Sequence, residues 1–183
     1  MLQPPFPLHL RPLHLSDLPA VISIEQQSFP TVTQAKSYRY ELSENQLAHY
    51  QAVTARRTNQ DEQIFGYAGY WLIADEIHIS TIAVDPQWRG YGLGELLLQN
   101  ILHLAHEHAA ALVTLEVREN NQVAQDLYQK YAFDIVGRRR RYYRDTGEDA
   151  LLMTITLQSN RQYRHFLDRK QKQLHTRLAG TSF

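Results

Sequence analysis

The feature that most constrains this chain is a glycine-rich segment, residues 89–94 (RGYGLG), placed between two apolar stretches. Residues 77–84 before it are typical of a strand that stops at Asp85-Pro86, and residues 92–108 after it are typical of a long helix. A strand, a short glycine loop and a helix start leave bare backbone N–H groups that bind anions. The segment therefore predicts a diphosphate site, to which Arg89 adds a positive charge.

Other nucleotide-binding loops fit this segment poorly. The dinucleotide fingerprint requires glycine where Glu95 stands, and the mononucleotide P-loop requires a Gly-Lys-Ser/Thr ending that is absent. A kinase-type loop would be followed by a strand, whereas residues 96–101 are helical in pattern. Alternate glycines also occur in purely structural turns, so the flanking strand and helix carry the prediction.

Composition favours one compact domain. The 183 residues are 43% hydrophobic and 21% charged, which suffices for a single core. The absence of cysteine excludes disulfides, thiolate metal sites and a cysteine nucleophile. We find no membrane-spanning apolar run and no signal-peptide pattern, and therefore expect a cytoplasmic protein without membrane contact.

Strand-like and helix-like segments alternate along the chain. Helices are expected over residues 16–28, 33–43, 92–108 and 121–130, and strands over 8–13, 50–55, 64–73, 77–84, 112–117, 133–142 and 150–157. Asp17 is a candidate N-cap of the first helix. This order predicts an α/β fold with a mixed, twisted sheet of about six to seven strands, parallel where helices cross over and antiparallel in hairpins.

The C-terminal segment differs in charge from the rest. We divide the chain into a domain, residues 1–157, and a basic tail, residues 158–183. The tail has six arginines and lysines against Asp168, with apolar residues at helical spacing. It is expected to be a helix that packs on the domain or frays from it. Contact with a ribosome, an RNA or another partner is the less favoured alternative.

The Arg-x-x-Gly-x-Gly pattern of residues 89–94, between strand and helix, resembles the coenzyme A signature of the GNAT acetyltransferase superfamily. Residues 82–86, 115–118, 127–128, 140–143 and 147–150 resemble the RimI type, the ribosomal-protein alanine N-acetyltransferases, over roughly residues 8–157. The resemblance implies the GNAT fold, with acetyl-coenzyme A as cosubstrate. No metal is expected, because the three histidines of residues 103–108 lack the spacing of a zinc helix.

The resemblance also implies a cofactor site. The backbone of residues 82–84 would pair with the pantetheine arm where the sheet opens, the glycine loop would hold the diphosphate, and Asn121 would donate or accept a hydrogen bond. The implied cofactor-binding residues are Ile82, Ala83, Val84, Arg89, Gly90, Tyr91, Gly92, Leu93, Gly94, Glu95 and Asn121.

Two residues are candidates for catalysis. Glu116 alternates with Leu115 and Val117 on a strand, so its carboxylate faces a groove or solvent and can take a proton from an amine. Tyr128 lies seven residues after Asn121, so the two share a helix face. The resemblance implies that Tyr128 protonates the departing sulfur. Without the resemblance, we expect Glu116 to be a surface residue of a strand and Tyr128 to be a packing residue of the core.

The pKa values of amines indicate which kind of acceptor amine is favoured. An α-amino group has a reference pKa near 7.8 and lysine one near 10.4, so an N-terminal amine is more readily neutral at pH 7. With the resemblance, this predicts direct acetyl transfer in a ternary complex to the N-terminal α-amine, alanine, of a small-subunit ribosomal protein. Other N-termini, lysines or small amines are alternatives, as is a non-catalytic module that contacts the ribosome or RNA.

The basic run of residues 138–144 also has more than one interpretation. A solvated hairpin is favoured, RNA binding is an alternative, and the resemblance adds that Tyr142 or Tyr143 borders a peptide groove.

Two features depart from the family pattern: Ala132 replaces a glycine, and residues 30–33 lack a tryptophan.

Overall fold

The computed structural model describes residues 1–5, 7–31, 33–56, 62–157 and 161–181. The strands are β1 (Leu8–Pro12), β2 (Ala48–Arg56), β3 (Glu62–Ile73), β4 (Glu76–Val84), β5 (Leu112–Arg118), β6 (Asp134–Tyr143) and β7 (Glu148–Thr156). The helices are α1 (Leu18–Ser28), α2 (Ala35–Ser43), α3 (Leu93–Glu107), α4 (Gln122–Lys130) and α5 (Arg161–Ala179), with short 3-10 turns η1 (Leu15–Asp17) and η2 (Pro86–Trp88).

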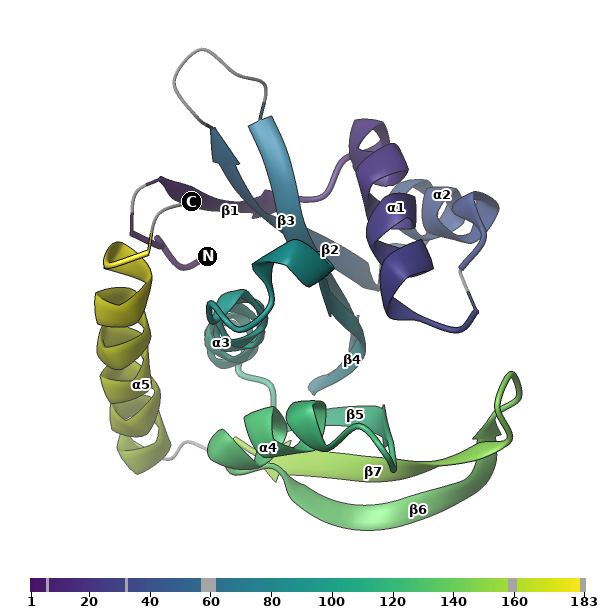
Figure 1. The fold of residues 1–183 in the computed structure, drawn as a ribbon. Coiled ribbons are helices and arrows are strands. Elements are labelled where there is room, and N and C mark those ends of the chain that lie inside the picture. The colour runs from purple at the N-terminus through teal and green to yellow at the C-terminus, as the bar shows by residue number, and fades with distance from the viewer. Residues whose placement is uncertain (6, 32, 57–61, 158–160, 182–183) are drawn as a thin grey trace.

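Within the described residues the strands form one seven-stranded sheet, in the order β1-β2-β3-β4-β5-β7-β6. Helices α1 and α2 cover one face and α3 and α4 the other, while α5 lies outside α3 (Figure 1). The predicted mixed α/β sheet is confirmed. Among the strands of the described ranges, only β4 and β5 pair in parallel, because the α3 crossover returns the chain in the same direction. The second crossover, α4, leads to β6 at the edge, and β7 inserts between β5 and β6.

Strands β4 and β5 separate along their length. Their ladder runs from Glu76 opposite Leu112 to Ile79 opposite Leu115. On the other side of β4, pairing with β3 continues to Val84. Residues 80–84 of β4 are therefore held by β3 alone, which is the opening of the sheet expected from the family resemblance.

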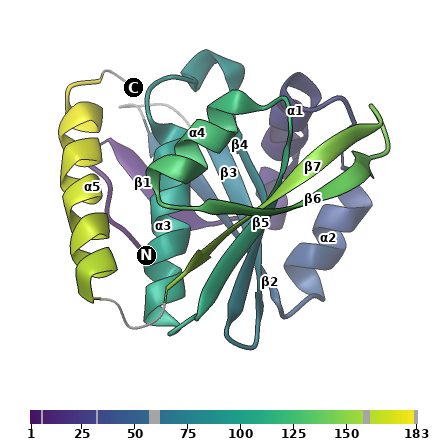
Figure 2. The ribbon, with the colours of Figure 1, turned by 90° about the horizontal axis from the view of Figure 1, so that it is seen from below.

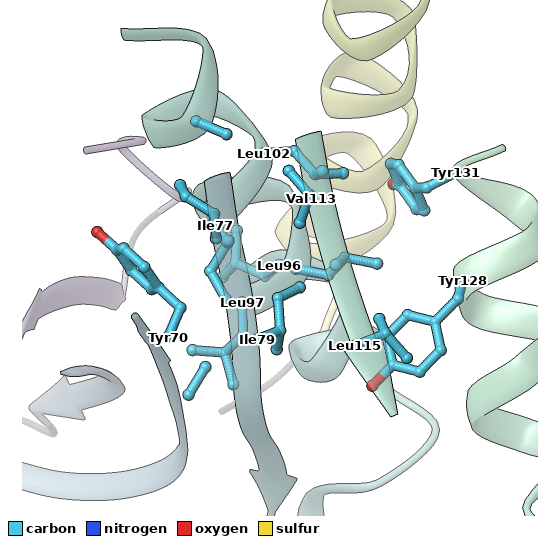
Figure 3. Packing of buried hydrophobic residues seen from close by; sticks show 14 of the residues in the cluster. Tyr70, Ile77, Ile79, Leu96, Leu97, Leu102, Val113, Leu115, Tyr128 and Tyr131 are labelled. Atoms are coloured by element: carbon cyan, nitrogen blue, oxygen red, sulfur yellow. The ribbon is translucent and has the colours of Figure 1, made fainter. Parts of the chain in front are cut away.

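Helix α3 lies at the centre of the core. Its leucines are buried around nearly the whole helix, because the sheet covers one side and α5 the other. Figure 3 shows Leu96, Leu97 and Leu102 beside the β4 residues Ile77 and Ile79. Full burial of one such side chain contributes about 1.5–3 kcal/mol, so α3 anchors the loop that precedes it.

The predicted C-terminal helix is present as α5. Leu167, Leu174 and Leu178 project from it into the same core and are 0–1% exposed. Figure 2 shows α5 running alongside α3. The interpretation that this helix packs on the domain is therefore confirmed for the described residues 161–181.

The ends of the first two helices differ from the prediction. Residues 15–17 form a 3-10 turn and α1 begins at Leu18, with Asp17 at the N-cap position but without a side-chain cap. The Asp17 carboxylate is engaged elsewhere, because it accepts from the Arg11 guanidinium through both oxygens and from the backbone N–H of His14 at 2.7 Å. Helix α2 begins at Ala35, two residues later than expected.

The predicted hairpin between β2 and β3 is formed, but residues 57–61 of its turn lie outside the described residues. None of the helices described here is long and apolar enough to cross a membrane.

Candidate active site

A cavity of about 730 Å³ occupies the opening between β4 and β5. Its walls come from both strands, the α1–α2 connection, α4 and the β6–β7 hairpin, whose tip reaches toward the side of α1 and α2 (Figures 1 and 2). Among the predicted site residues, those that line it are Ile82, Glu116, Asn121 and Tyr128. The structure therefore brings together both candidate catalytic side chains.

Glu116 faces the cavity, on the side of the sheet opposite to Leu115 and Val117, as the strand alternation predicted. Its side chain is only 5% exposed, so it is not a solvated surface residue. Oε2 lies 3.1 Å from Nε2 of His78, and Oε1 lies 3.1 Å from the guanidinium of Arg139. These two partners offset the cost of burying the carboxylate.

His78 and Arg139 could not be found by local sequence reasoning. His78 lies in β4 opposite Thr114, and Arg139 lies in β6, so both reach Glu116 through the order and register of the sheet. The imidazole of His78 stacks on Trp71, with ring centroids 5.4 Å apart and planes 14° apart.

Tyr128 projects from α4 toward β5, beside Leu115 (Figure 3). Its ring packs against Phe133 with centroids 5.8 Å apart, and the residue is 8% exposed. Burial raises the pKa of the phenol above its usual value, and nearby Tyr143 adds to this effect. Tyr128 therefore carries its proton at neutral pH, and the raised pKa also makes it a weaker acid than a solvated phenol.

Asn121 lies at the N-cap of α4 rather than within the helix. Its side-chain oxygen accepts a hydrogen bond of 3.1 Å from the backbone N–H of Ala124. Asn121 and Tyr128 therefore do not share a helix face as expected. Both residues nevertheless line the same cavity, because the cap residue still borders the opening.

The glycine loop has the backbone shape that its sequence predicted. Gly90 has φ +83° and Gly92 has φ +93°, which glycine adopts without strain. Gly92 is the N-cap of α3, so the first N–H groups of that helix have no partner within it. A Cβ at Gly90 would meet open space, whereas one at Gly92 would lie 2.9 Å from Leu174 of α5.

Arg89 joins this loop to neighbouring elements. Its Nε donates to the Val84 carbonyl at 3.1 Å, and its terminal nitrogen donates to Ser28 Oγ at 2.7 Å. Tyr91 is half-exposed, and its ring lies 6.0 Å from that of Trp88.

The Glu95 carboxylate is occupied by other protein groups. It accepts hydrogen bonds from Tyr131 at 2.7 Å and Arg177 at 2.6 Å, and Lys130 lies 2.6 Å away. Burial would raise the pKa of Glu95, but these three partners outweigh it and hold the pKa below its usual value. The Glu95 side chain thus links α3 with α4 and α5. Only the backbone of Glu95 is left to contribute to the predicted diphosphate site.

A third acidic residue, Glu25 of α1, was not singled out from the sequence. It is 2% exposed, lines the cavity, and accepts hydrogen bonds from the hydroxyls of Tyr38 at 2.5 Å and Tyr67 at 2.8 Å. Burial raises the pKa of both phenols. The available signal was an acidic residue on the apolar stripe of a helix, four residues after Val21.

The basic hairpin borders the cavity through Tyr142 and Tyr143. A register shift between Arg139 and Tyr143 marks a bulge, which can redirect side chains toward a site. Arg118 of β5 lies 3.9 Å from the Tyr143 ring centre and 2.7 Å from the Asp145 carboxylate. Within the basic run itself, Arg138 pairs with Glu119 and Asp149, and Arg139 pairs with Glu116.

Three comparisons with known proteins bear on this site. The family model described as acetyltransferase (GNAT) family matches residues 18–133. A candidate ribosomal protein bS18-alanine N-acetyltransferase of Bacillus subtilis is 38% identical over 148 residues, which is 81% of this chain and 95% of the relative. The ribosomal protein bS18-alanine N-acetyltransferase of Escherichia coli K12 is 31% identical, over 79% of this chain and 95% of the relative.

Solved structures show the same architecture. The crystal structure of the ribosomal-protein-S18-alanine N-acetyltransferase from Escherichia coli superposes with a TM-score of 0.72 at 27% identity, over 82% of this chain and 94% of that one. Arabidopsis thaliana NAA60, crystallised with acetyl-coenzyme A, has a TM-score of 0.74 at 18% identity, over 82% and 98% of the two chains.

Proposed function

Since this chain belongs to the GNAT acetyltransferase family, we propose that it transfers acetyl from acetyl-coenzyme A to the N-terminal α-amine of a protein, alanine of ribosomal protein bS18. The acceptor is that named for the Bacillus subtilis and Escherichia coli relatives. The observation that carries the proposal is the single cavity that holds both Glu116 and Tyr128 between the separated strands.

The residues present fit the cosubstrate. Beyond Ile79, β4 has a backbone edge without a β5 partner, where an extended pantetheine arm can pair as an added strand. A Cβ at Gly90 would meet open space, so the loop before α3 leaves room for a diphosphate. Asn121 lines the same cavity as Tyr128.

Glu116 and Tyr128 divide the proton transfers in the proposed reaction. Glu116 takes one proton from the ammonium group, directly or through water, so that the neutral amine can attack the thioester carbonyl. Tyr128 donates its proton to the sulfur as the carbon–sulfur bond breaks and regains one from the acetylated nitrogen. One proton is released overall, and the attack occurs within a ternary complex.

The cavity walls favour a cationic acceptor. Five carboxylates line it, against Arg118 and Arg144; the acidic residues are Glu25, Glu41, Glu116, Asp145 and Glu148. An excess of negative charge in a partly enclosed site attracts a protonated amine. Tyr142 and Tyr143 lie where they can contact the chain that follows the acceptor amine.

We further propose that α5 contacts the ribosomal particle that carries the acceptor protein. Arg164, Arg169 and Lys172 are exposed on this helix, which supports an electrostatic contact with ribosomal RNA phosphates. RNA binding that weakens steeply with salt, and that is lost when these three side chains are neutralised, is the expected result. Salt-independent binding would remove this part of the proposal.

The function is tested by thiol release from acetyl-coenzyme A. Peptides with the free N-terminal alanine of bS18 are compared with N-terminally blocked copies that contain lysine, and mass spectra locate the acetyl group. Acetylation of the free N-terminus alone is the expected result. Acetylated lysine would move the assignment to a broader acetyltransferase, and coenzyme A binding without turnover on any amine would favour a non-catalytic module.

A further inference from the structure

Glu116 is enclosed by the groups that bind it. Its carboxylate is 5% exposed, with Oε1 held by Arg139 and Oε2 by His78. After a transfer, the proton on this carboxylate lies within hydrogen-bonding reach of both partners.

The two partners of Glu116 differ in what they can do with a proton. The guanidinium of Arg139 is always charged and has no acceptor atom. An imidazole, by contrast, gains and loses protons near neutral pH. The His78 side chain is 23% exposed, whereas that of Glu116 is 5% exposed, so His78 connects the buried carboxylate with solvent.

The fold holds His78 in the orientation that this connection requires. His78 lies opposite Thr114 in the parallel ladder, so Glu116, two residues further along β5, is its diagonal neighbour on the same face of the sheet. The imidazole stacks on Trp71, whose indole N–H donates to Glu41 of α2 at 2.8 Å. Stacking restricts the ring plane and keeps Nε2 directed toward Glu116 at 3.1 Å.

Resting on the proposed function, we propose that His78 is a positioning and proton-exchange residue that returns Glu116 to its basic form after each transfer. The amine proton moves to Glu116, then from the carboxyl group to Nε2 of His78, and the imidazolium releases it to solvent. The titratable and charged groups that face this pair are Arg139, Tyr142 and Tyr143 of β6, with Glu41 reached through Trp71. An imidazole that already carries this proton cannot accept another, so removing His78 should change how kcat depends on pH.

The test compares wild type with His78→Gln across pH 5.5–9, with peptide and acetyl-coenzyme A both saturating. We expect kcat to fall about tenfold at pH 7, and the acid limb of its pH profile to change shape. Using kcat avoids the titration of the free peptide amine, which affects kcat/KM. His49→Gln is the matched control, because His49 also stacks on an aromatic ring, Tyr70, at 5.1 Å, whereas the histidine paired with Glu116 is His78. It should keep the wild-type profile.

A folded His78→Gln enzyme with the wild-type kcat and acid limb would overturn the inference, and so would equal losses in the two variants. If His78→Gln does not fold, His78→Ala with added imidazole carries the test. Partial rescue of kcat supports the role, and a folded, coenzyme A-binding variant without rescue contradicts it. Failure of the proposed function is distinguishable, because wild type itself would then not acetylate the peptide.

Discussion

Glu95 and Glu116 are two buried carboxylates that sequence reasoning assigned to one site, and their surroundings differ. Glu95, in the first turn of α3, contacts Lys130, Arg177 and Tyr131, and these partners come from or adjoin two other helices, α4 and α5. Glu116 lines the cavity, and one of its two partners is an imidazole. The first arrangement ties elements together, whereas the second leaves a carboxylate beside a partner that can change its charge.

Burial beside basic groups therefore does not by itself identify a catalytic acid or base. Glu95 is surrounded by two permanent cations and a phenol, which hold its pKa low and keep it ionised. Nothing about that environment requires proton transfer. Glu116 combines enclosure with access to the cavity, and this access, rather than burial, supports its proposed role.

The largest expected effect is that of Glu116→Gln. Because the amide cannot accept the amine proton, we expect kcat to fall about 100-fold or more, with coenzyme A binding retained. Thiol release under saturating conditions measures this, and Glu95→Gln is the matched control, which should keep most of its kcat per folded molecule. A kcat within about threefold of wild type for Glu116→Gln would end its assignment as the base.

Tyr128→Phe should give the next largest loss, about 10- to 100-fold in kcat. The phenylalanine ring keeps the packing against Phe133, so stability and coenzyme A affinity should remain near wild type. Steady-state kinetics beside calorimetric binding separates the two quantities. Unchanged turnover would leave Tyr128 as a packing residue only.

Glu95→Gln should act on stability instead. Losing the charged hydrogen bonds to Lys130 and Arg177 should lower the free energy of unfolding by about 2 kcal/mol at pH 7. The pKa of Glu95 is depressed in the folded protein, so its contribution is fully present above the unfolded pKa, about 4.3, and is lost as pH falls through the folded pKa.

Urea unfolding of wild type and Glu95→Gln at a series of pH values checks this. The difference between the two proteins should be constant from neutral pH down to about 4.3 and shrink below it. A difference that does not change with pH would show that Glu95 acts through packing rather than charge.

Arg177→Gln should have the smallest effect. Its side chain is 54% exposed, and ion pairs of exposed side chains contribute about 0–1 kcal/mol. The loss should also decline as salt is added. Unfolding at low and high ionic strength measures both points, and a loss above about 2 kcal/mol would show that α5 depends on this pair more than on its buried leucines.

Much of the fold was predictable because the responsible forces are local. Strand alternation and helical spacing placed nearly every element within a few residues, including α5. Errors occurred where other partners competed for a capping side chain, as when the Arg11 guanidinium and the His14 backbone N–H engaged the Asp17 carboxylate. The pair β4 and β5 was predictable from the α3 crossover, but the insertion of β7 beside β5 was not.

The features of the candidate site also divide into those that the sequence determined and those that the tertiary structure decided. By itself, the sequence determined the glycine loop, because the positive φ angles of Gly90 and Gly92 depend on the residue type at each position. It also determined the face of Glu116, since side chains alternate along a strand. Only the tertiary structure decided that Glu116 meets His78 and Arg139 while Glu95 meets Arg177, because these contacts join residues 23 to 82 positions apart and depend on sheet register and helix packing.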